Sequence, residues 1–257
     1  MNSSSGPKTI QSVEVSFSII ETLRESQPIT VSEVSTATSL PISTAYVHLD
    51  TLRQAGYVIK DGASYRLSFR FLELGDSTRQ QLNYFTTVKR AVNDLATITG
   101  EISGFAVEEQ GLRVILYRGG EGNPKDRRIP IGEYTYLHWT SLGNAILAHM
   151  PEHRIEEIVD RHGLPEGTSK TTTDLDRLRE ELEIIRSTGY AVDDEARHRG
   201  VRGIAVPLLD AEAQPLGSIG IVGPQARFDE HYLGEIVEVL FEKRDEIRSS
   251  LESKRVI

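Results

Sequence analysis

The sequence of 257 residues contains no cysteine, a single tryptophan and no match to the nucleophile elbow G-x-S-x-G. Without cysteine the chain cannot form disulfides, bind metal through thiolates or use a cysteine nucleophile. No apolar run approaches the roughly 18 residues that a membrane-spanning helix needs. The first residues, MNSSSGPK, lack the apolar core of a signal peptide. We therefore expect a cytoplasmic protein with no membrane partner, in which residues 1–9 form a flexible tail.

The chain also lacks the excess of basic residues that is common in DNA-binding proteins, because its formal net charge is −9. Residues 1–83 hold seven Lys and Arg against eight Asp and Glu, a net charge of −1, and the remaining residues carry −8. The N-terminal third therefore offers only a weak electrostatic attraction to a phosphate backbone. A hydrophobic content of 38% and a charged content of 26% are typical of a globular protein. The length allows one large domain or two ordinary ones.

The segment that begins at Thr30 has the pattern of two short helices joined by a tight turn. Thr30 is followed three positions later by Glu33, which is the spacing of a capping box. The first helix should end before Pro41, because the residue preceding a proline is pushed out of the helical region. We expect Ser43 to cap a second helix, in which apolar residues recur at helical spacing. These apolar residues are Ala45, Leu49 and Leu52.

A hairpin is predicted directly after the second helix, which Gly56 should end. The β-rich runs 57–59 and 64–67 flank the turn 60–63, which contains Asp61-Gly62. Asp-Gly between two such runs is a strong hairpin signal. Two helices followed by a hairpin indicate a winged helix-turn-helix, a DNA-binding unit.

Two further helices are predicted around this unit. Residues 10–25 have a helical apolar stripe and should pack beneath the two short helices. Residues 69–81 are also helical in pattern and should link the winged helix to the rest of the chain. A helix-turn-helix that reads a palindrome needs a two-fold axis, so we favour a dimer contact for this linker over plain domain packing.

From residue 84 onward strands and helices occur in mixed order, which predicts an α+β sheet domain. Strands are expected at 102–107, 112–117, 128–131, 203–209 and 216–222. Helices are expected from 84 to Gly100, at 141–150, 155–159 and 175–185, and as a long closing helix at 228–251. The glycine-rich segment 119–124 reads as a mobile loop rather than a phosphate cradle, because no Lys-Ser pair follows it.

Six stretches add a more specific signal: LPIST (40–44), LRQAGYV (52–58), LHWTSLGNAILA (137–148), GYAVDDE (189–195), GVRGIAVP (200–207) and VGP (222–224). In this order, behind a winged helix, they resemble the IclR family of transcriptional regulators from residue 10 to about residue 228. The resemblance implies a winged helix-turn-helix DNA-binding domain at 10–69, a linker and dimerisation helix at 70–83 and a GAF-like effector-binding domain at 84–257.

The function that this resemblance implies is ligand-responsive control of catabolic or metabolic genes, as a repressor or an activator. Its partners would be a pseudo-palindromic double-stranded DNA operator, a small-molecule effector and a second copy of the chain, with a dimer of dimers as the larger assembly. We expect no cofactor and no enzymatic activity.

The predicted recognition helix departs from the family, which often has a basic residue where Ile42 and Val47 stand. Operator sequence therefore cannot be transferred. Hydroxyl, aromatic and basic groups can reach phosphates or base edges, and an apolar side chain can contact a thymine methyl. On this basis the candidate DNA-contacting residues are Thr30, Ser43, Thr44, Tyr46, Val47, His48, Lys60, Ser64 and Arg66. For His48 a core position is an equal alternative.

The resemblance places the effector pocket at Leu137, Trp139, Ser141, Leu142, Gly143, Asp193, Gly203, Gly220 and Val222. Relatives that bind small carboxylates carry cysteine at the position of Gly203 and serine or a similar residue at the positions of Gly220 and Val222. Without these polar groups we expect a more apolar and roomier pocket, which favours a larger ligand such as an aromatic one.

Individual pocket residues suggest how such a ligand would bind. Free N–H groups at the helix start near Ser141 favour an anion, Asp193 would accept a donor, and Trp139 could stack on a ring. The alternatives are a core tryptophan and, for Asp193-Asp194, a solvated turn. The basic run Arg197, His198, Arg199 and Arg202 either offsets the acidic domain or attracts an anionic ligand.

Two other classes of function stay open. One is a small-molecule enzyme with a helix-turn-helix appendage, and the other is a winged-helix assembly module that docks a protein. A metal pair at His149 and His153 is disfavoured, because Pro151 between them breaks the helix that would align them.

Overall fold

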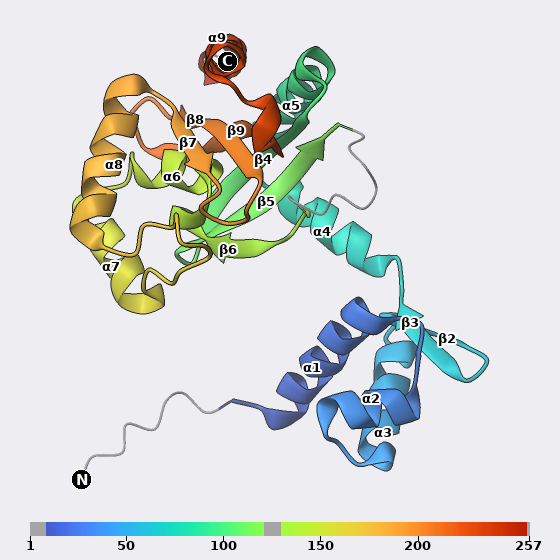
Figure 1. The fold of residues 1–257 in the computed structure, drawn as a ribbon. Coiled ribbons are helices and arrows are strands. Elements are labelled where there is room, and N and C mark those ends of the chain that lie inside the picture. The colour runs from blue at the N-terminus through green and yellow to red at the C-terminus, as the bar shows by residue number, and fades with distance from the viewer. Residues whose placement is uncertain (1–8, 121–129, 256–257) are drawn as a thin grey trace. The chain divides into compact units, whose positions relative to one another are not determined.

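The computed structural model describes residues 9–120 and 130–255. It contains two compact units, Met1–Leu82 and Asn83–Ile257 (Figure 1). The predicted flexible tail lies outside the described residues except for Thr9, and so does the predicted loop beyond Gly120. The mixed α+β class with an N-terminal helix-turn-helix is confirmed.

Three helices form the core of the N-terminal unit. They are α1 (Gln11–Ser26), α2 (Val31–Thr38) and α3 (Ile42–Gln54). Apolar side chains from all three meet in one buried cluster, which includes Ile19, Leu23, Val34, Ala45 and Leu49. The apolar spacing of the sequence therefore identified these helices correctly.

Of the two predicted N-caps, the one of α2 is present and the one of α3 is not. The capping box is confirmed, since Thr30 Oγ1 accepts from the Glu33 N–H at 3.4 Å and the Thr30 N–H donates to Glu33 Oε2 at 2.7 Å. The predicted Ser43 cap is wrong, because α3 begins at Ile42, two residues earlier than a Ser43 cap requires, with Pro41 as its N-cap. The Pro41 carbonyl accepts from the Ala45 N–H at 3.0 Å. Proline suits a helix start because its ring fixes φ and its missing N–H has no partner to lose there.

The wing is a small antiparallel sheet in the order β1-β3-β2. The predicted hairpin is confirmed as β2 (Val58–Asp61) and β3 (Ser64–Leu67), joined by a two-residue turn in which Gly62 has φ +60°. A short strand that the sequence analysis missed, β1 (Ile29–Thr30), pairs with β3 through Ile29 and Tyr65.

The predicted linker helix is present as α4 (Arg70–Gln80). None of its residues is buried within the chain. Phe69, Leu72 and Leu74 are 79%, 69% and 46% exposed. Apolar side chains of this size are normally covered when they occur in a group.

A six-stranded antiparallel sheet in the order β6-β5-β4-β9-β8-β7 is the centre of the C-terminal unit. Its strands are β4 (Ile102–Glu109), β5 (Leu112–Gly119), β6 (Tyr134–Tyr136), β7 (Ala191–Asp194), β8 (Val201–Leu209) and β9 (Pro215–Pro224). The central pairing of β4 with β9 joins two groups of consecutive strands, so the fold brings residues near 113 into the same sheet as residues near 193, 203 and 220.

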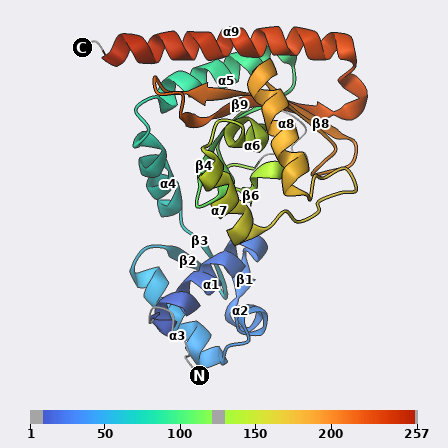
Figure 2. The same cartoon turned by 90° about the vertical axis from the view of Figure 1, so that its left-hand side faces the viewer.

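Helices cover both faces of this sheet (Figures 1 and 2). One face carries α5 (Phe85–Thr99) and the long α9 (Glu230–Arg255), which lie side by side. The other face carries α6 (Ser141–Leu147), backed by α7 (Glu152–His162) and α8 (Leu175–Thr188). The 3-10 turns Leu137–Trp139 and Gln225–Arg227 precede α6 and α9.

Two expectations about this unit were wrong. The described part of the predicted strand 128–131 is not a strand, and the edge strand forms instead at Tyr134–Tyr136. The predicted helix 141–150 ends at Leu147, before Pro151. The alternative of a solvated turn at Asp193-Asp194 does not hold, because these residues end strand β7 and pair with β8. No described helix has the length and apolar character needed to cross a membrane.

Candidate functional site

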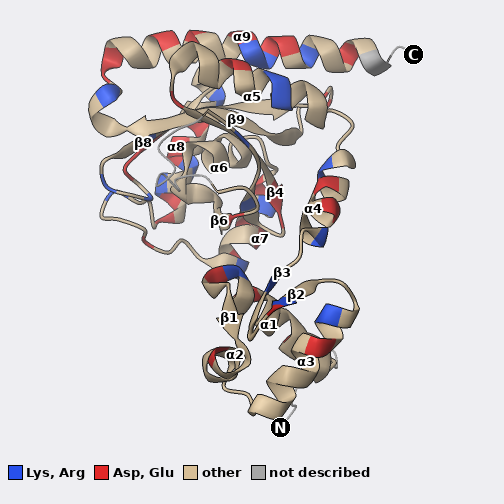
Figure 3. Ribbon diagram, turned by 90° about the vertical axis from the view of Figure 1, so that its right-hand side faces the viewer, with Lys and Arg blue, Asp and Glu red and all other residues tan. Residues whose placement is uncertain are grey.

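One side of α3 is exposed and uncharged. Ile42, Tyr46 and Val47 are 56%, 48% and 60% exposed, and Ser43 is also exposed. These positions follow the i, i+1, i+4, i+5 spacing of one helix face, which we call the α3 surface. Figure 3 shows few charged residues on α2 and α3. The α3 surface therefore offers one phenol, one hydroxyl and two aliphatic groups.

The charged residues of α3 are paired with one another. Arg53 Nη2 lies 2.7 Å from Asp50 Oδ1. Hydrogen bonds from Arg53 and Gln54 hold the pKa of Asp50 below its ordinary value. The Arg53 charge is thus offset within the helix and adds little positive field to the α3 surface.

The remaining predicted DNA-contacting residues are less available. Thr30 is engaged in the cap of α2. His48 is half-buried and hydrogen-bonded through Nδ1 to Ser16 of α1 at 2.9 Å, which favours its core alternative. Thr44 is also half-buried.

In the wing, Lys60 is exposed, with Nζ 5.6 Å from the centre of the Tyr65 ring. Ser64 and Arg66 are half-buried. The exposed members of the predicted set are therefore Ser43, Tyr46 and Val47 on α3 and Lys60 on the wing.

In the C-terminal unit a small cavity lies between the sheet and the start of α6. Its volume is about 30 Å³. Strand register builds its floor, because Asp193 on β7 pairs with Gly203 on β8, which pairs with Val222 on β9. The cavity is lined by Arg113, Thr140, Ser141, Leu142, Asp193, Arg197, His198, Val201, Gly203, Gly220, Ile221 and Val222.

Two arginines in this lining share one carboxylate. Arg113 on β5 is 1% exposed, and its Nη2 donates to Glu133 Oε2 at 3.0 Å. Arg197 forms a two-bond pair with the same carboxylate, from Nη1 to Oε2 at 2.9 Å and from Nη2 to Oε1 at 2.7 Å. Among the described residues, the Nε atoms of both arginines are buried without a hydrogen-bond partner. A buried donor left unpaired costs about 1–3 kcal/mol, so this arrangement calls for an acceptor.

Burial changes the titration of several groups in the cavity. It lowers the pKa of Arg113 to about 10, helped by the nearby charge of Arg197, so Arg113 stays protonated at neutral pH. Burial raises the pKa of Asp193 to about 7, against the opposing hydrogen bond from the Ala196 N–H. It also lowers the pKa of His198, which is therefore mainly neutral at pH 7.

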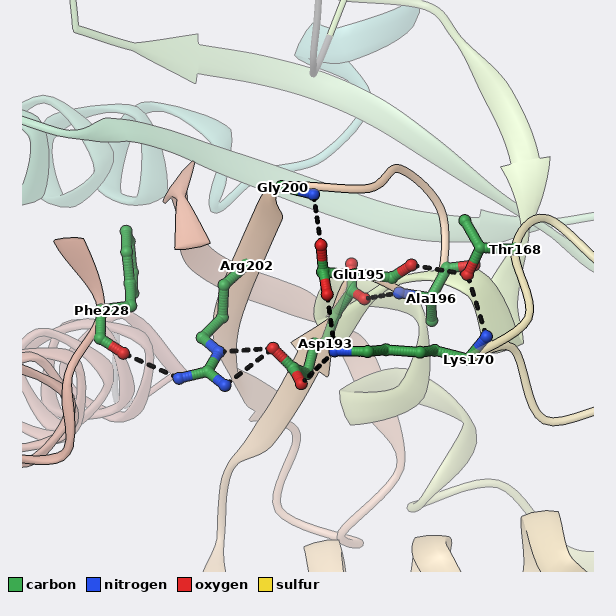
Figure 4. Close-up of polar contacts among 9 residues, drawn as sticks. Thr168, Lys170, Asp193, Glu195, Ala196, Gly200, Arg202 and Phe228 are labelled. Atoms are coloured by element: carbon green, nitrogen blue, oxygen red, sulfur yellow. Dashed lines mark hydrogen bonds and ion pairs between the residues drawn. The ribbon is translucent and has the colours of Figure 1, made fainter. Parts of the chain in front are cut away.

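The loop after β7, which carries Arg197 and His198, is held by a polar network (Figure 4). Lys170 Nζ contacts Asp194 Oδ2 at 2.9 Å and Glu195 Oε2 at 2.5 Å. Arg202 bridges Asp194 Oδ1, at 2.7 Å, and the Phe228 carbonyl, at 2.7 Å. These contacts fix both ends of the loop and so position Arg197 over the sheet.

Comparison with known families agrees with both units. The model of the bacterial transcriptional regulator IclR C-terminal domain matches residues 77–248, and that of the IclR helix-turn-helix domain matches residues 12–62. The chain belongs to the IclR family.

Individual relatives of this IclR-family chain match over nearly its whole length. It is 28% identical to the probable HTH-type transcriptional regulator ArcR of Halobacterium salinarum, covering 96% of each chain. The crystal structure of the Thermotoga maritima IclR shares 27% identity with a TM-score of 0.82, covering 95% of this chain and 99% of that one. A structure of an IclR homologue from Microbacterium hydrocarbonoxydans complexed with 4-hydroxybenzoate has the same fold, with 23% identity, a TM-score of 0.80 and coverage of 94% and 99%.

The IclR fold brings six of the nine predicted effector residues to the cavity: Ser141, Leu142, Asp193, Gly203, Gly220 and Val222. The other three lie elsewhere. Leu137 is in the hydrophobic core. Trp139 packs against Tyr136, with ring centres 4.8 Å apart, and its Nε1–H donates to the Pro165 carbonyl. At Gly143 an added Cβ would lie 2.0 Å from the Leu137 carbonyl, so this glycine allows close packing.

The expectation of a roomier and more apolar pocket was wrong for two reasons. First, the space beside the glycines is filled, because a Cβ on Gly203 would lie 2.8 Å from Ser141 Oγ and one on Gly220 would lie 2.5 Å from the Ile204 carbonyl. Second, two arginines line the cavity. The expected free N–H groups at the start of α6 are partly used as well, since Thr140 Oγ1 accepts from the Gly143 N–H.

Sequence reasoning missed Arg113 and Glu133 and identified Arg197 only as part of a basic run. Arg113 is a basic residue within the otherwise apolar start of β5, where Val114, Ile115 and Leu116 follow it. This charge in an apolar run was the available signal, because a buried charge needs a partner or a ligand.

Proposed function

We propose that this IclR-family regulator binds a small organic carboxylate in the cavity beside Arg113 and Arg197 and changes its affinity for operator DNA in response. The observation that carries the proposal is the pair of guanidinium groups in the cavity wall with unpartnered Nε atoms among the described residues. Arginine is well suited to carboxylates because its planar donors match the two oxygens.

The side chains on the cavity floor complement such a ligand. Asp193 is protonated over much of the range below pH 7, so its carboxyl group can donate a hydrogen bond to a ligand oxygen. Ser141 is buried at the cavity wall and offers a hydroxyl group. A carboxylate that carries a second polar group therefore fits this lining better than a purely apolar molecule.

Ligand binding must change the protein. A volume of about 30 Å³ accommodates about one or two water molecules, which is too little for an organic acid of more than a few atoms. The effector must therefore bind a more open form, in which the loop carrying Arg197 or the start of α6 has moved. A ligand that binds only this form shifts the population toward it, and this is the change that DNA binding would register.

On the DNA side, we propose that the α3 surface enters the major groove and that Lys60 of the wing contacts phosphate. Val47 and Ile42 suit thymine methyl groups, and Ser43 and Tyr46 suit phosphates or base edges. The unit has few basic groups, so direct base contacts should carry a larger share of the affinity than in strongly basic regulators.

We further propose a homodimer. Ile10, Val13 and Phe17 form an exposed apolar stripe along α1, at 68%, 47% and 62% exposed. The exposed Phe69, Leu72 and Leu74 at the linker add a second apolar group. A two-fold dimer would cover these side chains and present two α3 surfaces to a pseudo-palindromic operator.

Fluorescence anisotropy with duplexes tiled across the gene's own upstream region tests the proposal. The expected result is saturable binding to one duplex that Tyr46→Ala weakens and that a panel of carboxylates alters, 4-hydroxybenzoate among them. The matched control is Tyr134→Ala, because Tyr134 is a similarly exposed tyrosine of the C-terminal unit. Binding to no duplex, with or without the acids, would contradict the proposal and favour the protein-docking module. Turnover of a panel acid would instead favour an enzyme.

A further inference from the structure

Among the described residues, the charges beside the effector cavity leave one positive charge in excess. Arg113 and Arg197 each contribute one positive charge, and in the described part of the chain Glu133 is the single carboxylate that pairs with both. Asp193 contributes little negative charge below pH 7, because burial favours its neutral form. The site formed by these groups is therefore suited to one additional negative charge.

Glu133 lies behind the arginines rather than in the cavity. It is absent from the cavity lining, whereas both arginines belong to it. Glu133 accepts only from Nη atoms, which leaves the Nε atoms of both arginines without a partner among the described residues. Its side chain is 24% exposed, whereas that of Arg113 is 1% exposed. Glu133 thus offsets part of the charge of the two guanidinium groups without itself lining the space for the ligand.

We propose that Glu133 sets the charge of the effector, so that the cavity accepts a monocarboxylate and rejects a dianion. This inference rests on the proposed function, which assigns the cavity to a carboxylate. With Glu133 ionised, a monoanion brings the buried cluster to neutrality. A dianion would leave a net negative charge in a buried site, which is costly to desolvate.

The substitution Glu133→Gln tests this directly, because it keeps the size of the side chain and removes its charge. Removing a nearby negative charge strengthens the attraction for each unit of charge on the ligand. The gain in the logarithm of affinity is therefore about twice as large for a dianion as for a monoanion. We expect the ratio of dianion to monoanion affinity to rise by about tenfold or more.

The probes are formate and oxalate, which are small and fully ionised at pH 6.5 and differ by one carboxylate. Their affinities for the full-length chain are measured by calorimetry and by the rise in the unfolding midpoint at constant ionic strength. The matched control is Glu108→Gln. Glu108 is 21% exposed and pairs with Arg154, which is not part of the cavity lining. It undergoes the same charge change at a similar exposure.

A second pair of variants distinguishes the effect of the charge change on anion affinity from an effect of damage to the fold. Arg197→Gln removes one positive charge and should weaken formate binding. The double variant E133Q/R197Q restores the charge excess of the wild type, so its oxalate to formate ratio should return toward the wild-type value. A merely structural role for Glu133 predicts no such recovery.

The outcomes are distinct. The proposal is supported if the ratio of oxalate to formate affinity rises in E133Q, stays constant in E108Q and returns toward the wild-type value in the double variant. If R197Q weakens formate binding but E133Q leaves the oxalate to formate affinity ratio unchanged, the role of Glu133 is overturned. The carboxylate site itself would then still stand. Failure of both anions to bind the wild type and E133Q overturns the carboxylate site and this inference together.

Discussion

Replacing Asp193 by asparagine should make the C-terminal unit less sensitive to rising pH. The pKa of Asp193 is about 7 in the folded chain and has an ordinary value of 3.8 when the chain is unfolded. The folded state therefore binds the extra proton between these values, so the stabilisation from the protonated form is complete below pH 3.8 and is lost as the pH rises through 7. A difference of about three pH units corresponds to about 4 kcal/mol in the free energy of unfolding.

The assay is urea unfolding between pH 4.5 and 8.5, followed by the fluorescence of Trp139. This residue is the only tryptophan and lies in the C-terminal unit, so the signal reports on that unit alone. The part of this difference that falls between pH 4.5 and 8.5 is about 3 kcal/mol, so D193N should gain about that much relative to the wild type as the pH rises across this range. Its amide oxygen can still accept from the Ala196 N–H.

A neighbouring carboxylate provides a control of opposite sign. Partial burial raises the pKa of Asp194, but hydrogen bonds from Lys170 and Arg202 outweigh this effect and hold it below its ordinary value. The stabilisation from Asp194 is thus present at neutral pH and lost on acidification, so D194N should lose stability at neutral pH. If the unfolding free energies of the wild type and D193N ran parallel over the whole pH range, Asp193 would not titrate differently in the folded and the unfolded chain.

Three further predictions concern the fold and the DNA-binding unit. Thr30→Ala removes the cap of α2 and should cost about 1 kcal/mol, seen as an earlier urea midpoint of the N-terminal unit by circular dichroism; an unchanged midpoint would contradict the cap. Gly143→Ala forces a Cβ against the Leu137 carbonyl and should cost about 1–3 kcal/mol or more, whereas Gly75→Ala, with open space around the added Cβ, should not destabilise α4. Lys60→Ala should reduce the slope of log affinity against log salt by about one per protomer without changing sequence preference, and a changed preference would point to a base contact instead.

The N-terminal unit was the most predictable part of the chain, because its signals are local. The Thr30–Glu33 capping box and the turn at Gly62 each depend on residues within a few positions of one another. The strand at Ile29 was missed because two residues show no alternation, and its pairing depends on the distant Tyr65. The Ser43 cap failed because the helix already begins at Ile42, directly after Pro41, so Ser43 lies within its first turn.

The position of the cavity beside α6 was predictable from the sequence, but its size and charge were not. Six expected residues meet there because resemblance transfers the register of strands. The cavity is small because the Ser141 hydroxyl group fills the space beside Gly203. Its charge depended on Arg113 and Glu133, which lie 20 positions apart and meet only through the pairing of β5 with β6. Neither fact is visible in the pattern of one sequence.

We expect a carboxylate bound at Arg113 and Arg197 to be coupled to DNA binding. The most direct measurement is the operator affinity at increasing carboxylate concentration, together with the carboxylate affinity of the free and the DNA-bound protein. The acid should change the DNA dissociation constant by at least about fivefold, DNA should change the acid's affinity by the same factor, and Arg197→Gln should abolish both effects. A DNA affinity that does not respond to any bound carboxylate, or that responds equally in the Arg197 variant, would contradict this coupling.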